Sequence, residues 1–244
     1  MAVTVYKTEF ELLEAIALYF INVAQQSIHK NGKFNVALSG GNSPKKLYQL
    51  LSSGEYKNKI EWDKVNFFFG DERYVPDNDE QRNSLMAQKT LFEPLHISPL
   101  KIFKVDTSLP PNDSAQKYSS TINRHFNPAT VQFDLILLGL GDNSHTVSLF
   151  PFTPVLNETS ATIKAVFVKE QNNYRITMTA PMINQAKHIA FLVFGKEKAE
   201  AVRHVLKDER DIEKYPAQLI QPTDGEVFWF LDYGAASHLE LPME

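Results

Sequence analysis

Short apolar runs recur along the chain, and each is only four to nine residues long. Runs of this length with few charges are typical of strands buried on both faces of a sheet, because both rows of side chains must then be apolar. Longer stretches with helical periodicity separate most of them. The alternation predicts an α/β fold with a largely parallel, doubly wound sheet and helices on both faces. The expected strands are 34–39, 65–70, 133–141, 165–168, 189–195 and 227–232.

The helical stretches have apolar residues at spacings of three and four. The clearest covers 8–29, with Gly32 placed to end it. The proline-bearing segment 109–114 is expected to be a loop. Since no repeat or linker divides the chain, we expect residues 1–244 to form a single α/β domain. The other expected helices are 44–51, 83–92, 114–123, 182–189 and 196–207.

Composition excludes several classes of function. The 244 residues include no cysteine, which excludes disulfides, thiolate nucleophiles and thiolate metal sites. The net charge of −4 is spread along the chain, without the basic stripe that nucleic acid or an anionic membrane requires. The N-terminus lacks a signal-peptide pattern, and no segment approaches ~20 apolar residues. We therefore expect a cytoplasmic protein with neither a nucleic-acid nor a membrane partner.

A glycine turn follows the expected strand 34–39. Gly40 and Gly41 precede Ser43, a suitable N-cap, and Pro44, a suitable first helical residue. Backbone N–H groups in such a turn, beside the positive end of a helix, favour an anion such as phosphate. The same pattern is also ordinary punctuation between a strand and a helix, and it matches neither the dinucleotide nor the nucleoside-triphosphate fingerprint.

Charged residues follow the apolar run at 65–70. Arg73 can hold a phosphate or carboxylate with two donors, while Asp71 can hold a sugar hydroxyl or the arginine itself. The alternative interpretation of Asp71, Glu72 and Arg73 is a solvated charge cluster at the edge of the sheet.

A histidine follows the apolar run at 133–138. Gly139 and Gly141 permit a tight turn, which would set the His145 imidazole over the carboxyl edge of the sheet. An imidazole with a pKa of ~6.5 can take a proton from water and return it within one turnover. By spacing alone, however, a single loop histidine is more often structural.

Two further basic residues occupy comparable positions. Arg175 begins a possible short strand, and Lys198 lies in the first turn of a helix that starts after a strand and Gly195. Taken alone, Lys198 is typical of a solvated helix lysine. Because the carboxyl ends of parallel strands meet at one edge, the residues after these strands together predict a single ligand site.

The segments SGGNSP, FFFGDERYVP, GLG…SHTVSLFP, RITMT, GKEKA and PAQLIQPTDGEVFWFLD follow one another over nearly the whole chain. In this order they resemble the 6-phosphogluconolactonase family, which shares a superfamily with glucosamine-6-phosphate deaminase. The resemblance implies hydrolysis of 6-phosphoglucono-δ-lactone to 6-phosphogluconate in the oxidative pentose phosphate pathway, by a histidine-activated water and with no cofactor and no metal. The implied partner is the small phosphosugar lactone, bound by a monomer or small homo-oligomer.

The resemblance also assigns site residues by motif. It implies that His145 is the catalytic base, with Asn143 and Arg73 as further catalytic residues. It implies that the substrate is bound by Ser39, Gly40, Gly41, Asn42, Ser43, Asp71, Arg73, Arg175 and Lys198.

Three positions depart from the family pattern G-x-G-x-D-G-H-x-A-S-L-F-P, since this chain has Asn143 for aspartate, Ser144 for glycine and Val147 for alanine. Asn143 can accept a hydrogen bond from the imidazole and fix its tautomer, but it cannot stabilise an imidazolium with a full charge. Asp142 can supply that charge if the loop is rearranged. Ser144 requires a backbone conformation that is not restricted to glycine. We interpret the chain as an active variant.

Two alternative functions stay open. A glucosamine-6-phosphate deaminase or isomerase would continue its histidine motif toward F-N-E-P, whereas residues 148–151 here read S-L-F-P. A non-catalytic phosphosugar-binding protein, suggested by Asn143, would bind 6-phosphogluconate without accelerating lactone opening. Ammonia release from glucosamine 6-phosphate would favour the first of these alternatives.

Overall fold

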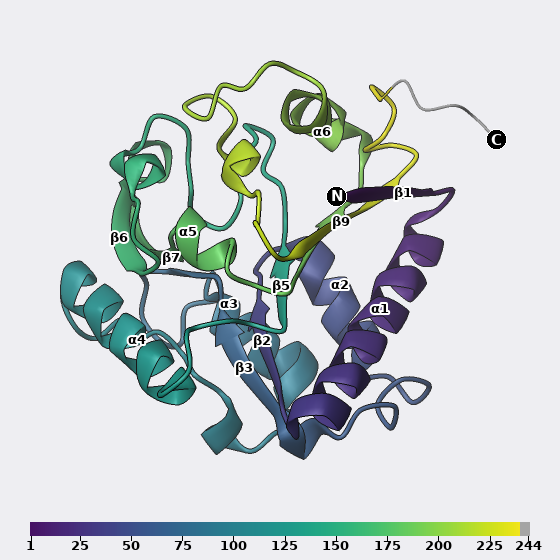
Figure 1. Cartoon of the computed structure of the whole chain (residues 1–244), viewed down its shortest axis with the longest axis vertical. Helices are drawn as coiled ribbons and strands as arrows, with labels where there is room; N and C mark the ends of the chain where they lie inside the picture. Colours follow the sequence, from purple (N-terminus) through teal and green to yellow (C-terminus); the bar gives the residue numbers. More distant parts are fainter. Residues whose placement is uncertain (240–244) are drawn as a thin grey trace.

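The computed structural model describes residues 1–239 and contains a six-stranded parallel sheet and a three-stranded antiparallel sheet (Figure 1). All neighbouring strands of the larger sheet run parallel, as predicted. The chain proceeds from β2 outward to β3 on one side and from β5 to β8 and β9 on the other, so the direction of winding reverses between β2 and β5. The order is β1 (Ala2–Tyr6), β9 (Glu226–Asp232), β8 (His188–Val193), β5 (Leu135–Leu138), β2 (Phe34–Leu38) and β3 (Val65–Phe69).

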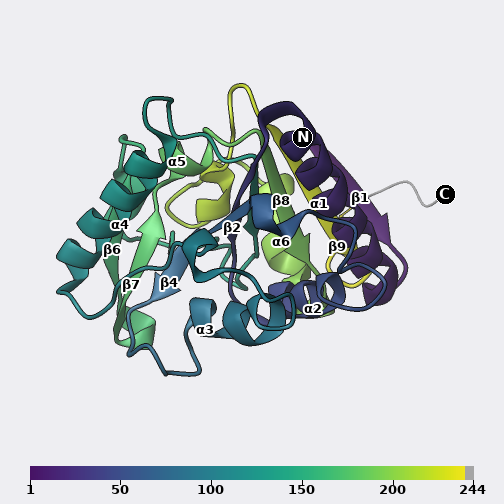
Figure 2. The same ribbon diagram turned by 90° about the horizontal axis from the view of Figure 1, so that it is seen from below.

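Helices cover both faces of the parallel sheet, as the alternating pattern predicts (Figures 1 and 2). Successive side chains of a strand point to opposite faces, so Phe67 and Phe69 join one core while Phe68 joins the other. The first core is covered by α1 (Glu9–Asn31), α2 (Asn42–Leu51) and α3 (Asn83–Ala87), which continues into a π-helical turn at Gln88–Phe92. The second is covered by α4 (Pro111–Phe126), α5 (Ala180–Ile183), α6 (Ala199–Leu206) and the smaller sheet.

The antiparallel sheet is the main element that the sequence did not predict. It consists of β4 (Asp71–Arg73), β7 (Asn173–Met178) and β6 (Ile163–Val168), in that order. Segment 165–168 therefore belongs to this sheet and not to the parallel one. Gly70 alone separates β3 from β4, so the chain passes from one sheet directly into the other.

Several expected boundaries were wrong for local reasons. Pro111 starts α4 inside the segment expected to be a loop, since proline fits the first helical position. The stretch 182–189 is mostly turn and strand, because α5 ends at Ile183 and β8 begins at His188. Strand β1 was missed because its residues lie at a sheet edge and are largely exposed. No helix within residues 1–239 is long and apolar enough to cross a membrane.

Candidate active site

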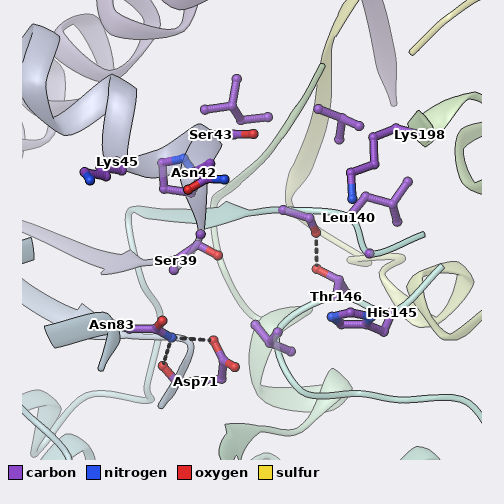
Figure 3. Close-up of a pocket in the computed structure, with 18 of the residues that line it drawn as sticks. Ser39, Asn42, Ser43, Lys45, Asp71, Asn83, Leu140, His145, Thr146 and Lys198 are labelled. Atoms are coloured by element: carbon purple, nitrogen blue, oxygen red, sulfur yellow. Dashed lines mark hydrogen bonds between the residues drawn. The ribbon is translucent and has the colours of Figure 1, made fainter. Parts of the chain in front are cut away.

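The loops that follow β2, β3, β5 and β8 line one cavity of about 700 Å³. These four strands are neighbours in the sheet, so their carboxyl ends bring the loops together at the point where the winding reverses. The volume is typical of a small-molecule site. Every site residue expected from the sequence lines this cavity except Asn143. Ser39, Asn42 and Ser43 lie on one side of it, opposite His145 and Lys198 (Figure 3).

The glycine turn begins helix α2 earlier than predicted. Gly41 is the N-cap, with a left-handed φ of 100°, and α2 starts at Asn42. The expectation of an N-cap at Ser43 and a first helical residue at Pro44 was therefore wrong, although both lie in the first turn. The hydroxyl of buried Tyr48 donates to Ser39 O (2.8 Å) and accepts from Ser39 N (3.0 Å), which ties the turn to α2. Residues at the start of α2 line the cavity, and the first N–H groups of a helix have no acceptor within the helix itself.

Two arginines form a cationic pair on the antiparallel sheet. Arg73 and Arg175 lie directly opposite each other on β4 and β7, so their side chains share one face. The Nε atoms of both are buried and have no hydrogen-bond partner within residues 1–239. Burial, with a further contribution from Arg73, lowers the pKa of Arg175. Adjacent like charges with unused donors indicate a site for an anion.

Asp71 faces the same cavity from β4. Its side chain is buried and accepts hydrogen bonds from Ser148 Oγ (2.6 Å) and Asn83 Nδ2 (3.2 Å; Figure 3). Asn83 also lines the cavity and lies so close to Gly40 that a Cβ there would be 1.8 Å from Asn83 Oδ1. Sequence reasoning missed Asn83, whose only signal is its place at the start of an expected helix.

Glu72 has a different role from its neighbours. It is fully buried and accepts from the backbone N–H groups of Arg73 (2.8 Å), Asn83 (2.7 Å) and Ser84 (2.9 Å). Burial raises the pKa of the Glu72 carboxyl, and these donors oppose the shift. A solvated charge cluster is therefore wrong for this segment, because Glu72 fixes the start of α3 to the strand that carries Asp71 and Arg73.

The loop that carries His145 is braced by its own hydrogen bonds. Thr146 Oγ1 donates to Gly139 O (2.9 Å), and Gly141 N donates to His145 O (2.8 Å). The imidazole stacks on Phe150, with ring centroids 4.0 Å apart and planes inclined by 20°. A Cβ at Gly141 would lie 2.0 Å from His145 Nδ1, so only glycine permits this approach.

Asn143 sets the tautomer of His145. Its Oδ1 lies 2.6 Å from His145 Nδ1, and because an amide oxygen only accepts, Nδ1 carries the proton and Nε2 keeps its lone pair. Burial lowers the pKa of His145 to about 4; Lys198 and Arg175 lower it further, while Asp71 and Asp142 oppose the shift. The ring is therefore neutral at pH 7 and able to accept a proton at Nε2.

Two of the three positions that depart from the family pattern have an unusual backbone conformation. Ser144 has a φ of 62° and Val147 a φ of 46°, so both non-glycine residues adopt left-handed conformations. The left-handed region favours glycine but is also open to other residues, so Ser144 meets the expectation that this backbone is not restricted to glycine. Ser144 O accepts from Ala217 N (3.0 Å), which helps to hold this conformation. Asp142 forms an ion pair with Lys198, whereas the partner of His145 Nδ1 is Asn143.

The cavity thus combines a neutral imidazole, two guanidinium groups, the start of a helix and three lysines, which are Lys45, Lys46 and Lys198. Such a set can bind a phosphorylated ligand and move one proton. No group of three or more histidine, aspartate and glutamate side chains within residues 1–239 is arranged to hold a metal ion.

Comparisons with known protein sequences match this chain to proteins and a family model that carry the name 6-phosphogluconolactonase. A family model described as "Glucosamine-6-phosphate isomerases/6-phosphogluconolactonase" matches residues 7–229. A Nostoc protein named "6-phosphogluconolactonase" is 38% identical over 219 residues, which cover 88% of each chain. An Arabidopsis thaliana protein named "6-phosphogluconolactonase 3, chloroplastic" is 31% identical over 97% of this chain and 75% of its own.

Solved structures share the fold. The "6-phosphogluconolactonase from Trypanosoma cruzi" has a TM-score of 0.88 at 26% identity, covering 98% of this chain and 97% of its own. A monomeric glucosamine-6-phosphate deaminase has a TM-score of 0.83 at 22% identity, covering 98% of this chain and all of its own, and shares the fold alone.

Proposed function

Because the chain belongs to the glucosamine-6-phosphate isomerase/6-phosphogluconolactonase family, we propose that it hydrolyses 6-phosphoglucono-δ-lactone to 6-phosphogluconate in the oxidative pentose phosphate pathway. This makes it a carboxylic ester hydrolase. The observation that carries the proposal is the neutral His145, whose Nε2 has no hydrogen-bond partner within residues 1–239 and lies beside the cationic groups of one cavity.

The 6-phosphate binds at the amino end of α2 in this proposal. The N–H groups of Gly41, Asn42 and Ser43 supply donors, and Arg175 and Lys198 supply positive charge from the other walls of the cavity. Lys198 then exchanges the exposed Asp142 carboxylate for the phosphate. Binding the phosphate there fixes the position of the lactone ring relative to His145, which reduces the entropic cost of reaction.

Hydrolysis proceeds by general base catalysis. His145 Nε2 takes a proton from water while the water oxygen bonds to lactone C1, which gives a tetrahedral oxyanion. In this proposal Arg73, which lines the cavity, stabilises that oxyanion together with backbone N–H groups of the 139–145 loop. When the C1–ring oxygen bond breaks, the imidazolium returns its proton to the ring oxygen. The product acid then ionises to 6-phosphogluconate.

The test measures disappearance of freshly prepared lactone and subtracts the spontaneous rate. Wild type is expected to accelerate it, while His145→Ala loses most turnover but still binds 6-phosphogluconate. Arg73→Met should lower kcat more than it raises KM, whereas Lys198→Met should mainly raise KM. An unchanged rate in His145→Ala would refute the role of the base. Ammonia release from glucosamine 6-phosphate would favour the deaminase, and binding without acceleration would favour a phosphosugar-binding protein.

We propose further that residues 1–244 act as one α/β lactonase domain in the cytoplasm, as a monomer or small homo-oligomer. Both sheets contribute side chains to a single cavity, which supports one functional unit. Sedimentation of the purified protein measures its assembly, and cell fractionation measures its location.

A further inference from the structure

Within residues 1–239, His145 has no charged hydrogen-bond partner. Its Nδ1 contacts the neutral amide of Asn143, and its ring rests on the apolar face of Phe150. In the proposed reaction this ring becomes an imidazolium each time water is activated. A partly buried cation is costly unless a nearby anion compensates for it, and Asn143 cannot do so.

Four charged side chains influence the imidazole from the surrounding elements. Arg175 on β7 and Lys198, which precedes α6, disfavour a positive ring, whereas Asp71 on β4 and Asp142 in the same loop favour it. Asp142 is paired with Lys198, and its side chain is 72% exposed, so its charge is both neutralised and screened.

Asp71 differs from Asp142 in both respects. Only 6% of the residue is exposed, and its carboxylate accepts from the neutral donors Asn83 and Ser148. It forms no salt bridge within residues 1–239. A carboxylate in a buried position is weakly screened by solvent, so its field acts on the cavity.

Ser148 fixes Asp71 to the histidine loop. It lies three residues after His145, and its Oγ donates to Asp71 Oδ2 at 2.6 Å. Its backbone N–H donates to Thr177 Oγ1 (3.2 Å) on β7, which is paired with β4. Movement of Asp71 relative to the loop would break these contacts, so they hold the carboxylate against the segment that carries His145.

We propose that Asp71 supplies the negative charge that stabilises protonated His145, a charge that the neutral Asn143 cannot provide. The inference rests on the proposed function, since it gives the charged ring a role in turnover. In this role Asp71 is a positioning residue that acts through the field at His145, in addition to any contact with the substrate.

The first test is an NMR titration of the His145 ring, which requires no activity. Asn143→Asp is expected to raise the titration midpoint, and Asp71→Asn to lower it by about one pH unit, in both the wild-type and the Asn143→Asp backgrounds. Asp106→Asn is the matched control, since it removes a carboxylate that lies outside the cavity and is paired with Lys117. An Asp71→Asn midpoint equal to that of Asp106→Asn would overturn the inference.

The second test is kinetic. Asp71→Asn is expected to lower kcat about tenfold, and adding Asn143→Asp to it is expected to restore most of that loss. A structural defect would not be rescued by a carboxylate on the other side of the imidazole. If Asp71→Asn does not fold, Ser148→Ala is used instead, because it keeps the Asp71 carboxylate but removes the hydrogen bond that holds it to the histidine loop. The titration midpoint of His145 is then expected to fall by less than one pH unit. Absence of rescue would refute the inference, whereas shifted midpoints in a protein without lactonase activity would refute only the proposed function.

Discussion

Replacing Phe150 with leucine tests whether the stack on His145 contributes to catalysis. Phe150 is 5% exposed, and its ring lies 4.0 Å from the imidazole. Leucine retains most of the apolar volume but loses the ring contact, which is worth about 1 kcal/mol. If that energy holds the imidazole in its productive orientation, its loss lowers the productive population, and hence kcat, about fivefold. KM is expected to change little, because Phe150 supplies no charge or hydrogen bond to the phosphate.

The same substitution changes the solvation of the base. Burial is the main reason that the pKa of His145 is about 4, and leucine leaves part of the ring face open to water. The pKa is therefore expected to rise toward its ordinary value of ~6.5. The acid limb of the kcat profile should move to higher pH in the variant.

A matched substitution separates packing from catalysis. Phe126 is 8% exposed, packs against Phe68 and Phe133, and lies outside the cavity. Phe126→Leu and Phe150→Leu should both lose about 1 kcal/mol of stability in urea unfolding, but only Phe150→Leu should lose turnover. Initial rates of lactone loss, corrected for spontaneous hydrolysis, give kcat and KM. Equal kcat in the two variants, or a change confined to KM, would refute the orienting role of the stack.

Three further outcomes follow from the site. Arg175→Met is expected to raise KM at least about tenfold, because the phosphate loses a cationic partner, and a lower KM would contradict this assignment. The variant is expected to be no less stable without ligand, since the substitution removes a like charge beside Arg73. Glu72→Gln should lower the free energy of unfolding in urea by about 3 to 5 kcal/mol, because three backbone donors and Arg82 lose a buried carboxylate partner. A loss below about 1 kcal/mol would contradict this role of Glu72. As pH falls from ~6.5 toward about 4, the unfolded chain takes up the His145 proton before the folded chain does, so stability should decline across this window, and less steeply in His145→Gln.

The sequence predicted the parallel sheet and the edge at which the site forms, because fully buried strands need unbroken apolar runs. Phe67 and Phe69 illustrate this on one face of the sheet and Phe68 on the other, since both faces pack into a core. Glycines and polar residues after such runs mark the carboxyl ends of the strands. From those local signals the sequence predicted that the site residues share one site, and all of them except Asn143 line one cavity.

The antiparallel sheet had no comparable signal. Strand β4 is three residues long and charged, and it forms because β7 pairs with it across about a hundred residues of sequence. The spacing of apolar residues along a segment indicates which of its side chains are buried, but it does not indicate which distant segment pairs with it. Asn83 was missed for a similar reason, since its contacts with Asp71 and Gly40 join segments that only the fold brings together.

The pairing of β1 with β9 has a consequence for biosynthesis. Among the strands within residues 1–239, β1 is synthesised first, yet its partner in the sheet is β9, which is synthesised last of these strands. The four strands whose ends carry the catalytic cavity are complete by Val193, and Lys198 follows five residues later. The residues that line the cavity can therefore assemble in a nascent chain before β9 has been made. Until residues 226–232 are synthesised, β1 has no strand to pair with and stays exposed.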